Sequence, residues 1–329
     1  MSGFHYPGPG QAHDSRLATQ GALNSRAALF SATVALILGG LKGYAAWRTG
    51  SIAMLGSLAD TGLDLIASLV TLFAVRFAAQ PADFEHRFGH GKAEALAALF
   101  QVALISAAAV AIIVRSVSRF GDGSEPSEAA YGIGVSLFAI ALTFALLAYQ
   151  AHVLRRTGSI AIKADNVHYK SDLALNGSVI LALALESRLH WHGADALFGV
   201  GIGLWLGWSA WSTASHAIDQ LMDKEWPLQK RAHFLAVASK HPELIGIHDL
   251  RTRTSGTHDF VQFHMWVDPG MTVAQAHEVM DEVEAKLRAE FPGLDILIHP
   301  DPEGHVDRDD PIAARPAEDV VADLKAAGE

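Results

Sequence analysis

The stretch Leu58-Ala-Asp60-Thr-Gly-Leu-Asp64-Leu decides the fold, together with its distant counterpart Val167-His168-Tyr-Lys-Ser-Asp172-Leu. In each stretch, two side chains able to bind a metal stand four positions apart, which places them on one face of an α-helix. From residue 51 to 75 the only charged residues are Asp60 and Asp64, and carboxylates inside a membrane span are rare and usually functional. The sequence therefore predicts two membrane helices whose facing sides share three carboxylates and one imidazole.

The composition indicates a chain with a membrane part and a water-soluble part. Half of the 329 residues are hydrophobic, and the mean hydropathy is +0.21, which is too apolar for an entirely soluble protein. The chain has no cysteine, so disulfides and thiolate metal sites are excluded and His, Asp and Glu remain as candidate ligands. The net charge of −10 argues against nucleic acid as a partner.

Six apolar runs are long enough to cross a bilayer as helices of about 20 residues. The fifth run is interrupted by polar residues, and we expect its polar half to face the interior of the helix bundle. Lys42, inside the first run, is expected to extend to the membrane interface beside Trp47. The runs cover residues 27–46, 51–75, 93–114, 131–153, 160–185 and 194–217.

Basic residues in the loops predict the orientation of these helices, because cytoplasmic loops are enriched in Lys and Arg. The loops after the second and fourth runs hold Arg76, Arg87, Lys92, Arg155, Arg156 and Lys163. The opposite loops are poorer in basic residues and include an acidic segment at 121–128. Both termini are therefore expected in the cytoplasm.

A mixed helix and strand pattern follows Leu221. We expect a helix at 228–240, strands at 245–254 and 260–267 joined by a hairpin, a helix capped by Thr272 that ends near 290, and a strand at 295–299. This αββαβ order predicts an α+β domain with two helices on one face of a three-stranded sheet. The expected organisation is a flexible tail without a cleavable signal peptide (1–24), a six-helix membrane domain (25–220), a cytoplasmic metal-binding domain (221–302) and an acidic tail without assigned structure (303–329).

Asp60, Asp64, His168 and Asp172 form the first candidate metal site. These groups could serve only to link helices by hydrogen bonds. However, two carboxylates facing a His and an Asp would repel one another unless protonated or metal-bound, so we favour a cation site. Mixed oxygen and nitrogen ligands suit Zn²⁺. Because metal and protons would compete for these ligands, the site predicts cation/proton antiport.

Two further groups of candidate ligands lie outside the helices. Asp83, His86 and His90 belong to a loop whose Pro81, Gly89 and Gly91 allow the chain to fold back; a solvated polar loop is the alternative. The soluble domain has more potential ligands near its strand ends and on its second helix than scattered surface histidines usually provide. This last group is His248, His264, His277, His299 and Asp301.

These motifs, from about Ser25 to Pro302, resemble those of the cation diffusion facilitator family, and are similar to its bacterial zinc/proton antiporters of the ferrous-iron-efflux type. The resemblance implies a homodimer with six membrane helices per subunit and a metallochaperone-like cytoplasmic domain. It implies a transport site formed by the four intramembrane residues, a second site in the loop, and a zinc cluster that joins the two cytoplasmic domains and responds to cytoplasmic metal.

The resemblance also assigns Lys92 and Asp223 to a charged pair that ties the membrane helices to the cytoplasmic domain. Pro300 departs from the pattern, because close relatives often carry Gln there and proline has no side-chain ligand. The predicted protein is an inner-membrane antiporter that exports Zn²⁺, with Fe²⁺ and Cd²⁺ as further candidate substrates. The alternatives are an intramembrane zinc hydrolase, for which the sequence has no His-Glu-x-x-His or Gly-x-Ser-x-Gly motif, and a membrane-tethered metal sensor.

Overall fold

The computed structural model describes residues 10–49, 52–119, 131–189, 194–240, 242, 244–305 and 315–327. The acidic segment at 121–128 therefore lies outside the described residues, as do the first nine residues of the predicted tail. The chain divides into two compact units. One is Thr19–Ile218, and the other combines Met1–Ala18 with Asp219–Glu329.

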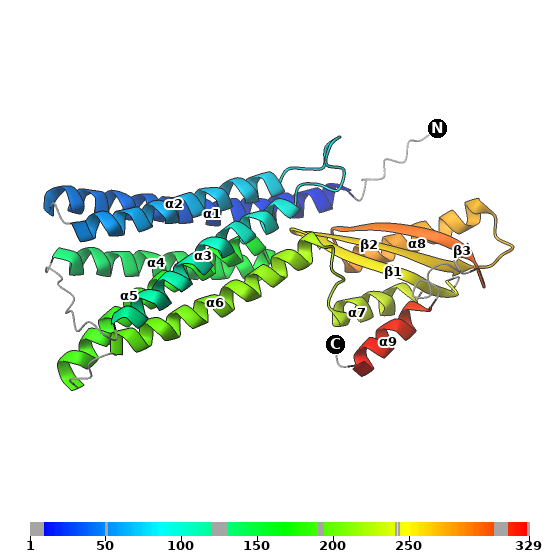
Figure 1. The fold of residues 1–329 in the computed structure, drawn as a ribbon. Helices are drawn as coiled ribbons and strands as arrows, with labels where there is room; N and C mark the ends of the chain where they lie inside the picture. The colour runs from blue at the N-terminus through cyan, green and yellow to red at the C-terminus, as the bar shows by residue number, and fades with distance from the viewer. Residues whose placement is uncertain are drawn as a thin grey trace. The chain divides into compact units, whose positions relative to one another are not determined.

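Six long helices make up the first unit, apart from the first nine residues of α1 and the last three of α6 (Figure 1). Each contains almost all of one predicted apolar run and continues beyond its C-terminal end by three or more residues, many of them polar. The helices are α1 (Gly10–Thr49), α2 (Ile52–Ala78), α3 (Lys92–Arg119), α4 (Tyr131–Thr157), α5 (Ile160–Leu189) and α6 (Ala194–Leu221).

Helix α1 begins at Gly10, inside the segment predicted to be a flexible tail. The prediction was wrong for residues 10–24, which are helical, and residues just before the apolar run pack into the bundle. Leu23 packs against a buried cluster formed by α1, α2, α3, α4 and α5. Asn24 is buried, and its Nδ2 atom donates to Oε1 of Glu94 over 3.3 Å.

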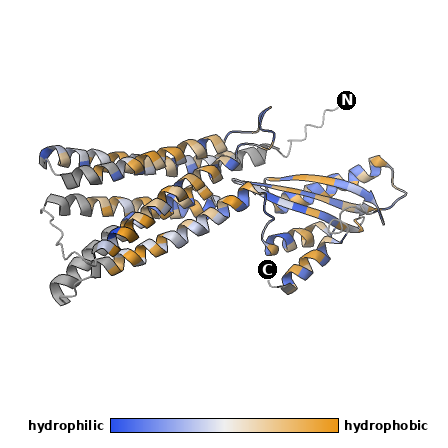
Figure 2. Ribbon diagram, in the orientation of Figure 1, coloured by the Kyte–Doolittle hydropathy of each residue, from blue (hydrophilic) through white to orange (hydrophobic). Residues whose placement is uncertain are grey.

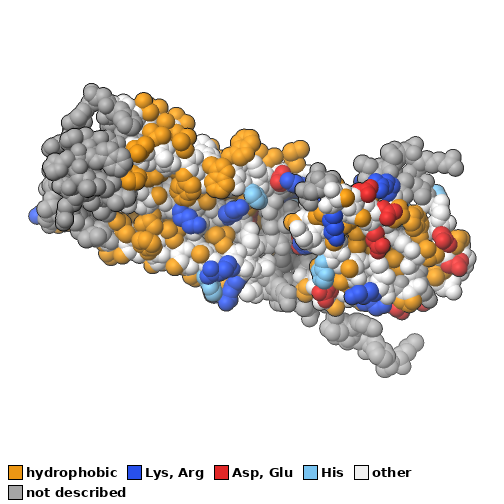
Figure 3. All heavy atoms as spheres, turned by 90° about the horizontal axis from the view of Figure 1, so that it is seen from below, with side chains coloured by type: hydrophobic (Ala, Val, Ile, Leu, Met, Phe, Trp, Pro, Cys, Tyr) orange, Lys and Arg blue, Asp and Glu red, His pale blue; other side chains and the backbone are white. Residues whose placement is uncertain are grey.

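The outer surface of the helical unit is apolar, as a membrane domain requires. Within the described residues, four segments combine the length and hydropathy needed to cross a bilayer: Ala18–Arg48, Asp60–Ala78, Lys92–Ser118 and Phe138–Thr157. Large apolar side chains face outward, including Phe73 at 68% and Trp211 at 75% exposure, and hydrophobic residues dominate this unit in Figures 2 and 3. By contrast, Asp165 and Asn166 of α5 are buried, which confirms that the polar half of α5 faces inward.

The second unit has the predicted αββαβ order. Helix α7 (Leu228–Ala238) precedes strands β1 (Gly246–Ser255) and β2 (His258–Val267), followed by α8 (Val273–Glu290) and β3 (Leu294–Pro302). Strand β2 lies in the centre, antiparallel to β1 and parallel to β3, because α8 carries the chain back before β3. Thr272 and Gln275 form a capping box at the start of α8, as the N-cap prediction requires.

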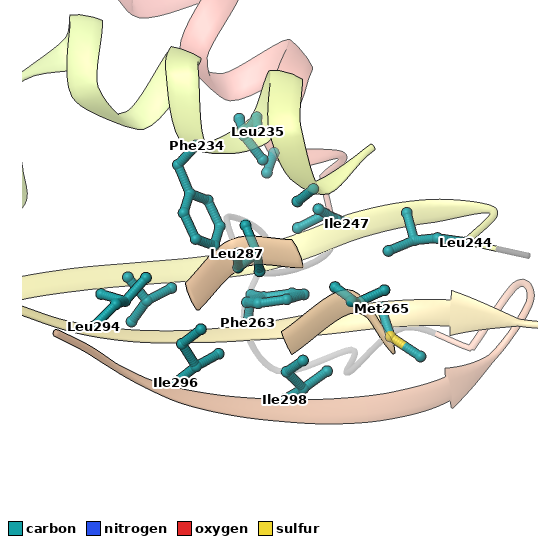
Figure 4. Packing of buried hydrophobic residues seen from close by; sticks show 14 of the residues in the cluster. Phe234, Leu235, Leu244, Ile247, Phe263, Met265, Leu287, Leu294, Ile296 and Ile298 are labelled. Carbon is teal, nitrogen blue, oxygen red and sulfur yellow. The ribbon is translucent and has the colours of Figure 1, made fainter. Parts of the chain in front are cut away.

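One face of this sheet forms the core. Phe263 and Met265 of β2 and Ile296 and Ile298 of β3 point to the same side and pack against α7 and α8 (Figure 4). Strand residues alternate between faces, so the residues between them, such as His264, lie on the opposite, open face. The core face therefore holds the domain together, and the open face carries most of the candidate ligands.

A further helix, α9 (Ala317–Ala327), lies in the segment to which the sequence assigned no structure. It belongs to the same core, because Ala317 and Val321 are buried among the residues of α7 and the sheet. The acidic composition did not indicate this helix, because the charged residues of α9 face solvent and only a narrow apolar stripe faces inward. The backbone before it pairs with β1 through a bridge between Pro316 and His248.

Candidate metal sites

Three of the four predicted intramembrane ligands lie together between α2 and α5. The Nε2 atom of His168 lies 2.9 Å from Oδ1 of Asp64 and 3.9 Å from Oδ2 of Asp172. One ligand atom from each residue fits within 4.8 Å of the others. The spacing of four places His168 and Asp172 on successive turns of one face of α5, and that face meets α2. Two carboxylates and an imidazole therefore converge on a volume that suits a single cation.

Asp60 does not belong to this close group. It lies one helical turn before Asp64 on the same side of α2, but its side chain is exposed in the single chain, and its oxygens lie outside the group within 4.8 Å. Its charge still acts on Asp172. Whether Asp60 completes a four-ligand site stays a prediction.

A buried carboxylate supports α5 from behind this group. Asp165 is fully buried one turn before His168, and it accepts hydrogen bonds from Ser31 Oγ of α1 (2.5 Å), Gln101 Nε2 of α3 (3.1 Å) and Gln150 Nε2 of α4 (2.7 Å). A buried carboxylate is tolerated only when its lone pairs are satisfied. Asp165 lies only three positions before His168, but the neutral donors that surround it are distant in sequence and could not be predicted.

Tyr169 connects the same helix to its neighbours. Its ring is buried, its hydroxyl donates to the backbone carbonyl of Ser31 over 3.2 Å, and it lies 3.0 Å from Oγ of Ser68 on α2. These contacts fix the rotation of α5 about its axis. The imidazole of His168 is thereby directed toward Asp64.

The loop between α2 and α3 brings Asp83, His86 and His90 together. Oδ1 of Asp83 lies 3.4 Å from Nδ1 of His86, and Oδ2 lies 3.3 Å from Nε2 of His90. The fold-back depends on Gly89, whose φ of 77° is in the left-handed region that glycine adopts readily. The backbone N–H groups of His86 and Glu85 donate to Asp83 over 2.6 and 2.9 Å, and these bonds hold the pKa of Asp83 below its usual value of 3.8.

The loop group is exposed on one side only. His90 is buried against Phe77, with ring centroids 4.5 Å apart, whereas Asp83 and His86 are exposed. An ionised carboxylate beside two imidazoles is a suitable donor set for a transition-metal ion. The arrangement is more ordered than a solvated polar loop requires.

In the second unit, Asp301 lies at the centre of the candidate cluster. Its Oδ2 atom lies 3.2 Å from Nε2 of His248 and 2.8 Å from Nδ1 of His264, while its Oδ1 atom lies 3.4 Å from Nε2 of His299. The sheet register explains this convergence, because His248 pairs with His264 and His264 pairs with His299 across adjacent strands. All four residues belong to the open face of the sheet.

His248 has the burial and the protonation state expected of a metal ligand. Its ring is buried and stacks on Trp266 with centroids 4.4 Å apart. Within the described part of the chain, its buried Nδ1 atom has no hydrogen-bond partner. Burial lowers the pKa of His248 below its usual value of 6.5, and the neighbouring His264 lowers it further, so the ring stays neutral, as metal binding requires.

His277 does not join this cluster within one chain. It lies on α8 with 68% of its side chain exposed, 4.0 Å from Asp281. Helix α8 covers the core face of the sheet, whereas the cluster lies on the open face. A cluster that includes His277 would therefore need a second subunit to supply it, and the predicted zinc cluster that joins two subunits stays a prediction.

Asp249 is a candidate ligand that the sequence did not reveal. Its Oδ2 atom lies 3.8 Å from Nε2 of His264, and it lines an open pocket with His264 and His299. A β-bulge between His248 and Arg251 and a φ of 45° turn Asp249 toward the open face. The only available signal was that Asp, more than most residues, tolerates this backbone conformation.

The predicted charged pair joins residues of different units. Lys92 is the first residue of α3, and Asp223 follows α6 with a φ of 53°. Within its own unit, Asp223 accepts a hydrogen bond of 3.4 Å from Nη1 of Arg253. The pairing of Lys92 with Asp223 stays a prediction.

Two family descriptions match the chain in succession. A model described as the cation efflux transmembrane domain matches residues 28–222, and one described as the cation efflux protein cytoplasmic domain matches residues 227–303. The cation-efflux pumps FieF of Salmonella arizonae and Salmonella typhimurium are each 41% identical over 291 residues, which is 88% of this chain and 97% of each pump.

Similarity to solved structures covers about a quarter of the chain. The metal-bound C-terminal domain of the CzcD transporter from Thermotoga maritima is 27% identical to this chain, with coverage of 24% of this chain and 94% of that domain and a TM-score of 0.23.

Proposed function

The chain belongs to the cation efflux family and is a cation-efflux pump, and from this premise we propose that it exports Zn²⁺ in exchange for protons. A transporter of this family is not an enzyme, so the intramembrane hydrolase is set aside. Efflux also sets aside the sensor that binds metal without moving it. The proposal concerns the metal, the counter-ion and the residues that bind them.

The observation that carries the proposal is the convergence of Asp64, His168 and Asp172. One imidazole among carboxylates favours Zn²⁺, because Mn²⁺ and Mg²⁺ prefer shells made entirely of oxygen. Fe²⁺ and Cd²⁺ are further candidate substrates. We propose Asp60 as the fourth ligand, since it lies one turn from Asp64 on the same helix and its charge acts on Asp172.

Proton exchange follows from the charge of this group. Carboxylates held at membrane depth need a compensating positive charge. A departing dication would leave them uncompensated unless protons replace it, and metal and protons compete for the same lone pairs. If the site opens alternately to the two sides of the membrane, this competition gives antiport.

The open face of the cytoplasmic sheet is proposed to bind a regulatory zinc ion. His248, His264, His299 and Asp301 would hold it, and the position of Nε2 of buried His248, 3.2 Å from Oδ2 of Asp301, supports a ligand role. His277 can take part only if a second copy of the chain supplies it, which agrees with the homodimer that we propose. Asp83, His86 and His90 are proposed as a separate binding site in the loop.

The topology is proposed to be that of a multi-pass inner-membrane protein with both termini in the cytoplasm. The basic residues Arg155 and Arg156 at the end of α4, with Arg76 at the end of α2, support this orientation. We also propose that the interlock between Lys92 and Asp223 holds in the dimer.

Transport in proteoliposomes tests the central claim. A zinc gradient should drive proton movement, read by a pH-sensitive dye, and Asp64→Ala should abolish it. Asp295→Ala is the matched control, because Asp295 is exposed on the cytoplasmic sheet and outside every candidate site. Full flux in Asp64→Ala would contradict the site assignment, and zinc uptake without proton movement would contradict antiport.

A further inference from the structure

The sequence predicted that Lys42 of α1 extends to the membrane interface, but in the structure it does not. Its Nζ atom donates to Oγ1 of Thr61 on α2 over 2.7 Å. Thr61 is buried and directly follows Asp60. Trp47, the expected interfacial neighbour, is 78% exposed and its ring lies beside Tyr44 instead. The ammonium group therefore points toward the helix that carries two of the candidate transport ligands.

Two glycines of α1 lie beside the same part of α2 as Lys42. Gly39 and Gly43 lie four positions apart on α1, on the side that faces α2. A Cβ atom at Gly39 would lie 3.7 Å from the methyl group of Thr61, and one at Gly43 would lie 3.8 Å from Leu58. Both distances are ordinary van der Waals contacts, and the half-buried side chain of Lys42, between these glycines, reaches α2.

The charge of Lys42 acts on the candidate transport site. Asp172 of α5 experiences the charges of Lys42, Asp60, Asp64 and His168 together. A lysine inside a membrane span is costly and usually pairs with an acidic group. One hydrogen bond to a threonine hydroxyl would not require a charged residue, since a neutral side chain could make it.

We propose that Lys42 sets the affinity of the transport site, as a built-in positive charge that weakens the binding of the metal ion and speeds its release. The tethered ammonium and the dication are attracted by the same carboxylates and repel each other across a region of low dielectric constant. This inference rests on the proposed function of Asp60, Asp64, His168 and Asp172. A pump benefits from such a charge, because an ion that binds too tightly is not released.

Zinc binding to the full-length protein in nanodiscs tests the inference. The background carries Asp83→Ala, His90→Ala and His248→Ala, so that calorimetry reports the intramembrane site. Lys42→Met keeps the length of the chain and removes the charge, and it should tighten zinc binding by about tenfold or more. Lys42→Arg keeps the charge and should bind zinc as the background protein does. Thr61→Val removes the hydrogen-bond acceptor only and should change the affinity less than Lys42→Met.

Transport kinetics provide a readout that structural damage would not reproduce. Lys42→Met should lower KM and kcat together, because tighter binding slows release, whereas a misfolded variant would lose activity without binding more tightly. Equal zinc affinity in Lys42→Met and Lys42→Arg, or weaker binding in Lys42→Met, would overturn the role of the charge. Asp64→Ala in the same background separates the two claims. If it still binds zinc normally, the proposed site is wrong; if it loses binding while Lys42→Met is unchanged, only the role of Lys42 is wrong.

Discussion

The Nε2 atom of His168 lies 2.9 Å from Oδ1 of Asp64, although 104 residues separate them in the sequence. This contact joins α5 to α2 and introduces the one nitrogen ligand among the four predicted transport residues. The identity of the residue at position 168 should therefore govern the choice of metal.

His168→Asp should shift the preference of the pump from Zn²⁺ toward Mn²⁺, because the site then offers only oxygen ligands. We expect zinc affinity to fall by about tenfold or more. Competition between the two metals in proteoliposomes measures the shift. His216→Asp, at an exposed position on α6, is the control. An unchanged ratio of zinc to manganese transport would show that His168 does not select the ion.

Asp165→Ala should destabilise the helical unit, because it leaves three donors from three other helices without their acceptor. The expected loss is about 1–3 kcal/mol, measured as a lower melting temperature in nanodiscs. Asp165→Asn keeps part of the hydrogen bonding and should lose less. Equal stability of all three proteins would mean that the buried carboxylate does not hold the bundle together.

Val321→Asp should unfold α9 from the cytoplasmic unit, because it places a charge in the core beside α7 and the sheet. Faster hydrogen exchange in α7 and β1 would report the loss. Ala322→Asp introduces the same charge at the exposed neighbouring position and serves as the matched control. If both variants exchange like the wild type, α9 does not contribute to the core.

The lowered pKa of His248 predicts how the metal-free domain responds to acid. Below about pH 6.5, His248 binds a proton in the unfolded chain more readily than in the folded chain. The free energy of unfolding therefore falls as the pH drops through this range. Histidine NMR of the metal-free protein should give a titration midpoint for His248 below 6.5. Trp266→Ala uncovers the ring and should move the midpoint upward, whereas Trp266→Phe preserves the stack. A wild-type midpoint at or above 6.5 would contradict the effect of burial.

The helices and the grouping of ligands on α5 could be predicted because both depend on local spacing. Hydrophobic length determines which segments cross a membrane, and a separation of four residues places His168 and Asp172 on one face. The αββαβ order was predictable for a similar reason. Thr272 marks the start of a helix, and Gly256 marks the turn between β1 and β2. In each case a few neighbouring residues determine the outcome.

The remaining features depend on how elements pack, which spacing does not reveal. Asp60 is exposed although it lies only one turn from Asp64, which contacts His168 of α5, and a hydrogen bond to Thr61 of α2 determines the direction of Lys42. A single bulge in β1 brings Asp249 to the open face. His277 and the strand histidines fall on opposite sides of one sheet, and this separation exists only once α8 has packed.

The indole of Trp266, stacked on His248 at 4.4 Å and an interplanar angle of 21°, gives the cytoplasmic domain an optical reporter of its own. A charge on one face of an aromatic ring perturbs its π-electrons, so the fluorescence of this tryptophan depends on whether the imidazole is bare, protonated or bound to an ion. The chain has seven tryptophans, so the part of the emission change that Trp266→Phe removes would report binding at the open sheet face without a dye near the ligands.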